Sequence, residues 1–175
     1  MQTRFAVALA AALIISPVLV SSAFPAGGGG GSTTQQCPKG QVRDRNGKCV
    51  APKQGMLDDD TLYENGAALA KAGRYDEAIT VLGYIQNKAD PRVLNYLGYA
   101  HRKSGRIQVG LGYYEEALRL NPNFVLTREY LGEAYLTLGD LASAKNQLNE
   151  IEKRCGKGCD EYTALASQIA QFNKT

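Results

Sequence analysis

The chain has 175 residues, of which 44% are hydrophobic and 21% are charged, and its formal net charge is +3. This length suits one domain with its own hydrophobic core, and 20 basic residues against 17 acidic ones argue against general nucleic-acid binding. With one histidine, four cysteines and no tryptophan, few side chains are available for a metal or acid–base site.

Residues 1–23 have the pattern of a cleavable export signal. Arg4 is the basic residue at the start, residues 5–20 are almost wholly apolar, and small residues follow up to Ala23. The apolar run is shorter than the ~20 residues that span a bilayer, and no cysteine for a lipid anchor follows it closely. We expect cleavage after Ala23, with Ala26 as the alternative. A periplasmic or secreted location without a membrane span follows from that.

Residues 24–57 are predicted to form a flexible arm that contains one small loop, in which Cys37 and Cys49 flank the hairpin-turn signal Asn46-Gly47. They begin with a run of five glycines, Gly27–Gly31, and a polar stretch, neither of which can bury a core. Between residues 37 and 53 there are five basic residues and one acidic residue. Such an arm either keeps the chain in solution or contacts an anionic surface or an acidic partner.

Four cysteines in an exported chain are expected to pair. Of the three connectivities, we favour the sequence-local one, which joins Cys37 to Cys49 and Cys155 to Cys159 and closes two short loops. Zinc is the alternative, but it would favour Cys-x-x-Cys pairs or histidine partners. Here eleven and three residues separate the cysteines, and His101 is far from both pairs. We therefore expect no metal and no cofactor.

From Leu57 onward the sequence repeats itself. Three glycines recur 32 and 34 residues apart, and a second glycine follows each of them by seven residues: Gly66 and Gly73, Gly98 and Gly105, Gly132 and Gly139. Periods in the low thirties indicate stacked helix pairs. The first glycine of each pair would allow two helices to approach closely, and the second would end a helix in the left-handed conformation.

These residues resemble the tetratricopeptide repeat family over about residues 59–158. The matching positions are Leu131, Gly132, Tyr135, Gly139, Leu141 and Ala144 in one unit, and Leu97, Gly98, Ala117, Leu118 and Pro122 in the unit before it. The resemblance implies an all-α fold, a short right-handed α-solenoid of three helix-turn-helix repeats. The repeats would occupy residues 59–90, 91–124 and 125–158, within a domain that begins at residue 58.

A capping helix is predicted within residues 159–175, because its apolar residues form one stripe that must pack on the last repeat. Asp160 is the expected cap of this helix. The helices are expected at residues 58–71, 75–87, 91–104, 107–120, 124–137, 141–153 and 161–172.

No catalytic arrangement is evident in the sequence. His101 is the one candidate acid–base residue, and its register places it inside a helix pair with no nucleophile beside it. Neighbouring carboxylates such as Glu115 and Glu116 point about 100° apart on a helix and do not form a paired acid site. We therefore expect a chain that is not an enzyme.

The resemblance implies that the first helix of each pair lines a concave groove. Carried over residue by residue, the groove register includes Lys71 on the first of these helices. The partner-binding positions chosen from it are Tyr63, Arg92, Asn95, Tyr99, Arg102, Glu129 and Glu133. The arginines would make one half of the groove basic and the glutamates would make the other half acidic. The family's clamp for the carboxylate tail of chaperones is absent, because its places hold Tyr63, Ala67, Tyr96, Leu126 and Tyr130.

By this resemblance, the chain is expected to be a non-enzymatic protein–protein interaction module of the bacterial periplasm or cell envelope, which holds a partner protein or peptide in its groove. The alternative is a structural or assembly component of an envelope complex. Such a component would act through its outer faces, its basic arm or self-association into a homo-oligomer. No nucleic-acid partner is expected.

Overall fold

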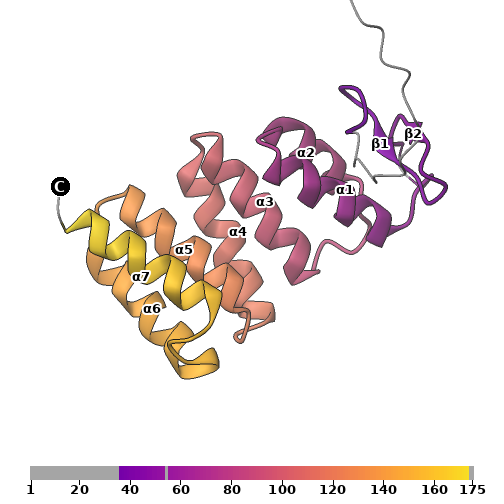
Figure 1. Cartoon of the computed structure of the whole chain (residues 1–175). Helices are drawn as coiled ribbons and strands as arrows, with labels where there is room; N and C mark the ends of the chain where they lie inside the picture. The colour runs from indigo at the N-terminus through magenta and orange to yellow at the C-terminus, as the bar shows by residue number, and fades with distance from the viewer. Residues whose placement is uncertain (1–35, 54, 174–175) are drawn as a thin grey trace, which may run out of the picture. The chain divides into compact units, whose positions relative to one another are not determined.

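The computed structural model describes residues 36–53 and 55–173. The expected export signal and the glycine run lie outside the described residues. Within this described part, a small hairpin precedes seven α-helices that follow one another in antiparallel pairs (Figure 1). None of the described helices is both long and apolar enough to cross a membrane.

The hairpin consists of β1 (Val42–Arg43) and β2 (Cys49–Val50), which pair antiparallel with Val42 opposite Val50. The helices are α1 (Asp59–Lys71), α2 (Tyr75–Gly83), α3 (Pro91–Lys103), α4 (Ile107–Leu120), α5 (Val125–Thr137), α6 (Leu141–Cys155) and α7 (Asp160–Phe172). The predicted all-α fold of three helix pairs and a final helix is thereby confirmed.

One helix differs clearly from its predicted length. Helix α2 ends at Gly83, whereas the sequence pattern predicts a helix as far as residue 87. Glycine is a poor helix former, and the carboxylate of Asp59 accepts hydrogen bonds from the backbone N–H groups of Gln86 and Asn87, each at 2.9 Å. These bonds, made across 27 and 28 residues, hold the chain in a turn after α2.

The second glycine of each repeat has the role expected for it. Gly73, Gly105 and Gly139 have φ angles of 79°, 87° and 80°, the left-handed region in which a side chain is strained. Each of these glycines follows the first helix of a pair and allows the chain to turn into the second helix.

The first glycine of each repeat lies where two helices meet closely. A Cβ atom added to Gly98 would lie 2.6 Å from Tyr114, and one added to Gly66 would lie 2.5 Å from Leu82. Gly110 is part of the same contact, since a Cβ there would lie 2.8 Å from the carbonyl oxygen of Gly98. Close packing of α3 against α4 therefore explains the glycine at position 110.

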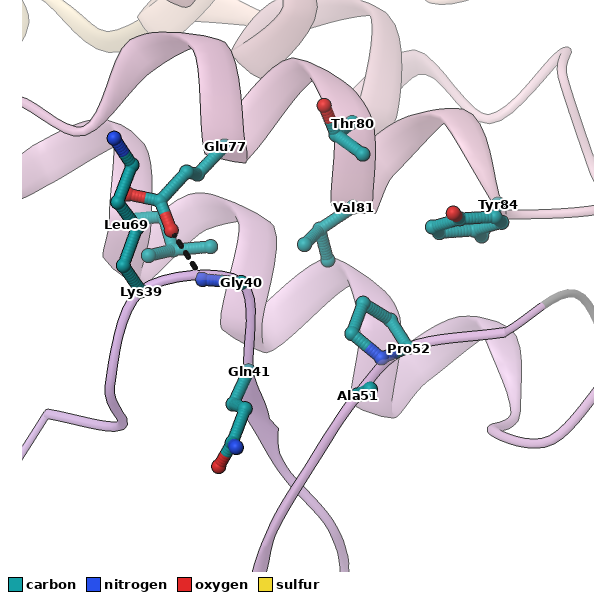
Figure 2. A pocket seen from close by; sticks show the side chains of 10 residues that line it. All are labelled: Lys39, Gly40, Gln41, Ala51, Pro52, Leu69, Glu77, Thr80, Val81 and Tyr84. Carbon is teal, nitrogen blue, oxygen red and sulfur yellow. Dashed lines mark hydrogen bonds between the residues drawn. The ribbon is translucent and has the colours of Figure 1, made fainter.

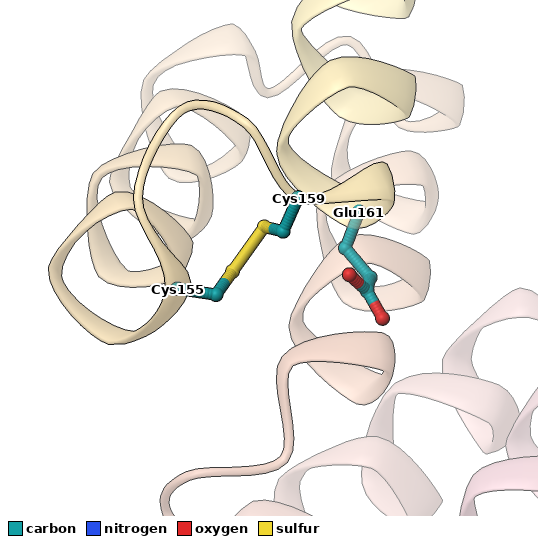
Figure 3. A group of neighbouring side chains, drawn as sticks. All are labelled: Cys155, Cys159 and Glu161. Carbon is teal, nitrogen blue, oxygen red and sulfur yellow. A yellow bond between two sulfur atoms is a disulfide. The ribbon is translucent and has the colours of Figure 1, made fainter.

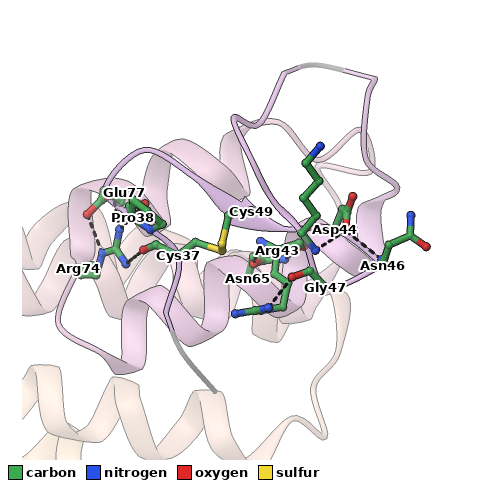
Figure 4. The surroundings of a disulfide bond; sticks show 11 residues. Cys37, Pro38, Arg43, Asp44, Asn46, Gly47, Cys49, Asn65, Arg74 and Glu77 are labelled. Atoms are coloured by element: carbon green, nitrogen blue, oxygen red, sulfur yellow. Dashed lines mark hydrogen bonds and ion pairs between the residues drawn. A yellow bond between two sulfur atoms is a disulfide. The ribbon is translucent and has the colours of Figure 1, made fainter. Parts of the chain in front are cut away.

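The hairpin is docked on the first repeat and is not a flexible arm (Figure 4). Val42 is 2% exposed and belongs to the same core cluster as Leu62 and Leu82. The Asn65 side chain accepts a hydrogen bond from the backbone N–H of Arg43 at 2.8 Å and donates one to its carbonyl oxygen at 2.9 Å. The structure thus has a hairpin at the predicted loop, but the loop is held on the first repeat, which the prediction of a flexible arm did not include.

A second set of contacts fixes the start of the hairpin. The guanidinium group of Arg74 donates to the carbonyl oxygen of Cys37 at 3.1 Å and pairs with Glu77 at 2.7 Å (Figure 4). Glu77 in turn accepts from the backbone N–H of Gly40 at 2.8 Å. In the structure Cys37 is joined to Cys49, so the covalent loop and these hydrogen bonds hold the same segment.

Helix α7 covers the far end of the helical stack. Leu165 and Ile169 are buried in one cluster with Ile151 of α6, and a Cβ atom at Gly132 of α5 would lie 2.5 Å from Leu165. The residue at the N-cap of α7 is Cys159, and the expected cap, Asp160, is instead the first helical residue.

Candidate protein-binding groove

The predicted groove residues lie on α1, α3 and α5, the first helices of the three pairs. We use the name inner face for the surface that these helices form together with α7. The structure brings most of the predicted residues together there, but it leaves fewer of them available to a partner than the sequence predicts. The reasons differ from residue to residue.

Tyrosine rings run across the inner face from α1 to α5. The ring centroids of Tyr63 and Tyr96 are 5.8 Å apart, those of Tyr96 and Tyr99 are 6.3 Å apart, and those of Tyr99 and Tyr130 are 5.0 Å apart. These four residues are called the tyrosine row. Tyr96 is buried, whereas the other three are half-buried and so present part of each ring at the surface.

Cationic side chains lie over this row at distances that allow cation–π attraction. The guanidinium carbon of Arg92 is 4.7 Å from the ring centre of Tyr63. The ammonium nitrogen of Lys71 is 5.6 Å from Tyr96, and that of Lys103 is 5.9 Å from Tyr99.

The three cations differ in their availability. Arg92 already pairs with Asp90 at 2.7 Å and with Asp60 at 3.2 Å. Lys71 and Lys103 are exposed, and neither has a carboxylate partner among residues 36–53 and 55–173. The two lysines are therefore the exposed cations of the described inner face whose charge is not already paired with a carboxylate.

The groove register taken from the family includes Lys71 but missed Lys103, although the sequence contains a signal for both. Lys71 follows Gly66 by five residues, and Lys103 follows Gly98 by five residues. They hold equivalent places in two successive repeats. The third repeat has Thr137 at this place, so the pattern ends before α7.

The prediction of a basic half facing an acidic half is wrong at the centre of the inner face. Arg102 of α3 and Glu133 of α5 form an ion pair with each other, and only 7% and 17% of their side-chain surfaces are exposed. Arg102 also donates to the hydroxyl of Tyr114 at 3.3 Å, and Glu133 accepts a further hydrogen bond from Gln168 of α7. The two charges neutralise each other, and these contacts join four helices, α3, α4, α5 and α7.

Asn95 is likewise not available to a partner. It is fully buried, and its side-chain oxygen accepts a hydrogen bond from the hydroxyl of Thr127 at 2.9 Å. Within the described residues its Nδ2 atom has no hydrogen-bond partner, an uncommon state for a buried amide. Asn95 thus links α3 to α5 beneath the surface, and its assignment to the partner-binding set is corrected.

Glu129 is the available carboxylate of the inner face. Burial raises its pKa to about 7, and the negative charges of Glu133 and Glu161 add to this effect. Its carboxylate has neither a hydrogen bond nor an ion pair with the part of the chain that the structure describes. A cationic or hydrogen-bond-donating group of a partner would stabilise the charged form of this carboxylate.

A groove of about 610 Å³ opens between α3, α5 and α7, beyond the tyrosine row. Its polar lining includes Lys103, Gln168 and Gln171, and its apolar lining includes Leu136 and Phe172. The groove residues on α7 were not predicted from the family resemblance, because α7 lies outside the three predicted repeats.

A smaller cleft of about 250 Å³ lies between the hairpin and α2 (Figure 2). Pro52, Val81 and Tyr84 give it an apolar wall, and Glu77 at one end is already bonded to Gly40. This cleft is separate from the inner face and contains none of the predicted groove residues.

His101 does not have the surroundings of an acid–base catalyst. Its Nδ1 atom accepts a hydrogen bond from Arg106 at 2.9 Å, and its ring stacks on Tyr113 with centroids 5.4 Å apart. Burial and the charge of Arg106 lower the pKa of the imidazole. The ring is therefore a packing element between α3 and α4.

Residues 91–124, which include α3 and α4, match the family model of the tetratricopeptide repeat. Two curated proteins are similar in sequence, and both are called "Uncharacterized protein ycf37". The one from Guillardia theta is 28% identical over 108 residues, which are 58% of this chain and 61% of that protein. The one from Pyropia yezoensis is 30% identical over 57 residues, 33% of this chain and 32% of that protein. The chain thus matches less than two thirds of either relative.

Solved structures share the fold. The first TPR of Spaghetti (RPAP3), bound to the HSP90 peptide SRMEEVD, has a TM-score of 0.58 at 21% identity and covers 67% of this chain and 94% of its own. The Yersinia enterocolitica chaperone SycD, in complex with a peptide of the translocator YopD, has a TM-score of 0.55 at 18% identity, with 66% and 88% covered. MamA from Desulfovibrio magneticus has a TM-score of 0.51 at 24% identity, with 54% and 55% covered.

These findings define the class of the protein. The described helices have the fold of tetratricopeptide repeats, and the second helix pair also carries the sequence signature. The match of residues 91–124 and the shared fold of the described helices support a protein–protein interaction module built from tetratricopeptide repeats.

Proposed function

We propose that this chain is an exported, non-enzymatic interaction module of the periplasm or cell envelope that binds a segment of a partner protein on its inner face. The observation that carries the proposal is the combination of half-buried tyrosine rings with the exposed cations of Lys71 and Lys103. Aromatic side chains are frequent anchors of protein–protein contacts, and the cations supply charge-assisted hydrogen bonds.

The arrangement of charges suggests how a partner segment is oriented. Lys71 and Lys103 lie at the α1–α3 side of the tyrosine row, and Glu129 lies at the α5 side. A segment with acidic residues at one end and a basic or neutral donor at the other end fits both. The sequence pattern assigns the basic and acidic halves of the groove to its arginines and glutamates. Because Arg102 and Glu133 pair with each other, we assign the two halves to the lysines and to Glu129 instead.

Two of the structures with this fold contain bound peptides, which supports the general mode of binding. The location rests on the export pattern of residues 1–23. Recovery of the full-length chain with Met1 intact from the cytosol would contradict the proposed location.

The test of the inner face is a comparison of two charge-reversal variants. K71E/K103E changes two exposed lysines of the inner face, and K48E/K145E makes the same charge change at exposed lysines of the hairpin and of α6. Both proteins, with an epitope after Thr175, are used to co-purify partners from the envelope fraction. We expect K71E/K103E to lose captured partners at least about tenfold and K48E/K145E to keep them, at unchanged helicity.

Arg102 is not suited to this test. Replacing it with alanine would leave the half-buried charge of Glu133 without its partner, a change that costs about 3 kcal/mol in stability.

The second candidate function is that of a structural or assembly component of an envelope complex. The observation in its favour is the docked hairpin, which presents Arg45, Lys48 and Lys53 as exposed basic residues on a fixed support. Loss of partners by K48E/K145E with retention by K71E/K103E would favour this function. A stable homo-oligomer at micromolar concentration would favour it as well.

A further inference from the structure

A group of three potential metal ligands lies at the turn between α6 and α7 (Figure 3). Cys155 is the last residue of α6, Cys159 is the N-cap of α7, and Glu161 lies in the first turn of α7. Their ligand atoms all lie within 4.8 Å of one another. In the structure, Cys155 is joined to Cys159.

We propose that the dithiol form of this chain binds a divalent cation of the zinc type through Cys155, Cys159 and Glu161. The metal site and the Cys155–Cys159 disulfide are then two alternative states of the same turn. This inference is independent of the function proposed for the inner face.

The chemistry of the three ligands fits such a cation. Zinc takes thiolate ligands at about 2.3 Å and carboxylate ligands at about 2.0–2.2 Å, so its ligand atoms lie about 3.5 Å apart in a tetrahedron. The three side chains therefore need only small movements once the sulfur–sulfur bond is broken. Two thiolates and one carboxylate leave the fourth position to water.

The turn has room for these movements. Gly156 has a φ angle of 77°, and a Cβ atom added to Gly156 or Gly158 would meet nothing within 4 Å. Cys155 is exposed, so a cation reaches the turn directly from solvent. The sequence alone disfavours zinc because it offers only two cysteines per region, and it is the fold that adds the carboxylate of Glu161.

The electrostatic surroundings also favour a cation. Within the described residues, Glu161 has no ion pair and no hydrogen bond through its side chain. Its charge and that of Asp160 reach Glu129 on the inner face, where they help to raise the pKa of that carboxyl group. Cys159 also lies at a helix N-terminus, which stabilises a thiolate. Lys153, Arg154 and Lys157 also lie near this turn, but they pair with Glu150 or Glu152. A bound cation would therefore offset the unpaired charge of Glu161.

Formation of the site begins with reduction of the disulfide. A water-soluble phosphine supplies two electrons, the sulfur–sulfur bond breaks, and the phosphine takes an oxygen atom from water to become its oxide. The two protons of that water remain on the two thiols. The cation then displaces both protons as it binds.

The test is a titration of the mature, phosphine-reduced chain with Co²⁺ as a spectroscopic substitute for Zn²⁺. We expect a thiolate-to-cobalt charge-transfer band that saturates at one equivalent and disappears when Zn²⁺ is added. The oxidised wild-type chain, which needs no substitution, should give no band. A reduced chain without the band overturns the proposal, and so does a band in the oxidised chain.

Variants assign the ligands. In the reduced state, C155S/C159S should lose the band and C37S/C49S should keep it, and E161Q should bind Co²⁺ about tenfold or more weakly. Far-ultraviolet circular dichroism checks that each variant keeps its helices. If E161Q binds as tightly as the wild type, or if the band follows Cys37 and Cys49, the three-ligand site is wrong.

Discussion

Glu129 differs from an ordinary surface glutamate because it is half-buried beside other carboxylates, and the charge of Arg102 offsets this only in part. Its pKa is raised from 4.5 to about 7, first by burial and then by the neighbouring carboxylates. The folded state therefore holds a proton there that the unfolded chain has already lost. The stabilising contribution is complete below pH 4.5 and is lost as the pH rises through 7.

The variant E129Q tests this linkage because a glutamine stays neutral at every pH. The free energy of unfolding of E129Q minus that of the wild type should increase by about 1 kcal/mol from pH 5 to pH 8, because only the wild type loses its proton in this range. The figure is reduced to allow for solvent screening. Urea unfolding at both pH values measures the difference. The exposed E64Q on α1 is the control and should show no such gain. Equal pH dependence of E129Q and the wild type would falsify the assignment.

Arg102 and Asn95 show what the repeat register does not contain. The register correctly places both on the first helix of the second pair, where the family has its groove. It does not contain the ion pair of Arg102 with Glu133, or the hydrogen bond that Thr127 donates to Asn95. Those contacts depend on the distance between α3, α5 and α7, which the spacing along one helix does not set. The site is thus predicted as a face but not residue by residue.

At the scale of the elements, glycine and proline positions predict most helix ends. Pro91 begins α3, and positive φ angles at Gly73, Gly105 and Gly139 end the first helix of each pair. The end of α2 was missed because its turn depends on Asp59, which is distant in sequence. The docking of the hairpin was missed for a similar reason, since its partner is the side chain of Asn65.

Asn65 occupies the place at which Leu97 and Leu131 occur in the later repeats. The substitution N65L restores that residue type but leaves the backbone N–H and carbonyl of Arg43 without their partners. We expect a loss of about 1–2 kcal/mol in stability and faster hydrogen exchange at the Arg43 amide. Amide exchange followed by mass spectrometry measures the second effect. N149L on the exposed side of α6 is the matched control, and unchanged exchange in N65L would contradict the docking.

At the scale of the whole described chain, the core is a series of clusters that follow the helix pairs. One cluster extends from Val42 of the hairpin to Tyr96 and Ala100 of α3, one is centred on Tyr114 and Leu131, and one is completed by α7. Each helix pair buries its apolar face against its neighbours, as in other solenoids. The hairpin and α7 cover the two ends, and each lies next to one of the expected disulfides.

This arrangement leads to a prediction about reduction of both cysteine pairs. Each bond closes a short loop, Cys37 to Cys49 across 12 positions and Cys155 to Cys159 across 4, and short loops contribute roughly 2–3 kcal/mol each in the chain-entropy account. The repeats between them contain no cysteine. Reduction should therefore lower the melting temperature by about 5–15 °C and leave the helix content nearly intact.

Circular dichroism with and without a phosphine reductant measures both quantities, and peptide mapping under non-reducing conditions checks the pairing on which they depend. The variant C37S/C49S should show the part of the shift that belongs to the hairpin, and C155S/C159S should show the part that belongs to α7. Complete loss of helix on reduction would mean that the clusters do not hold the repeats by themselves. A peptide that joins the hairpin to residue 155 or 159 would mean that the connectivity is wrong, because such a bond would tie together the two ends of the helical stack.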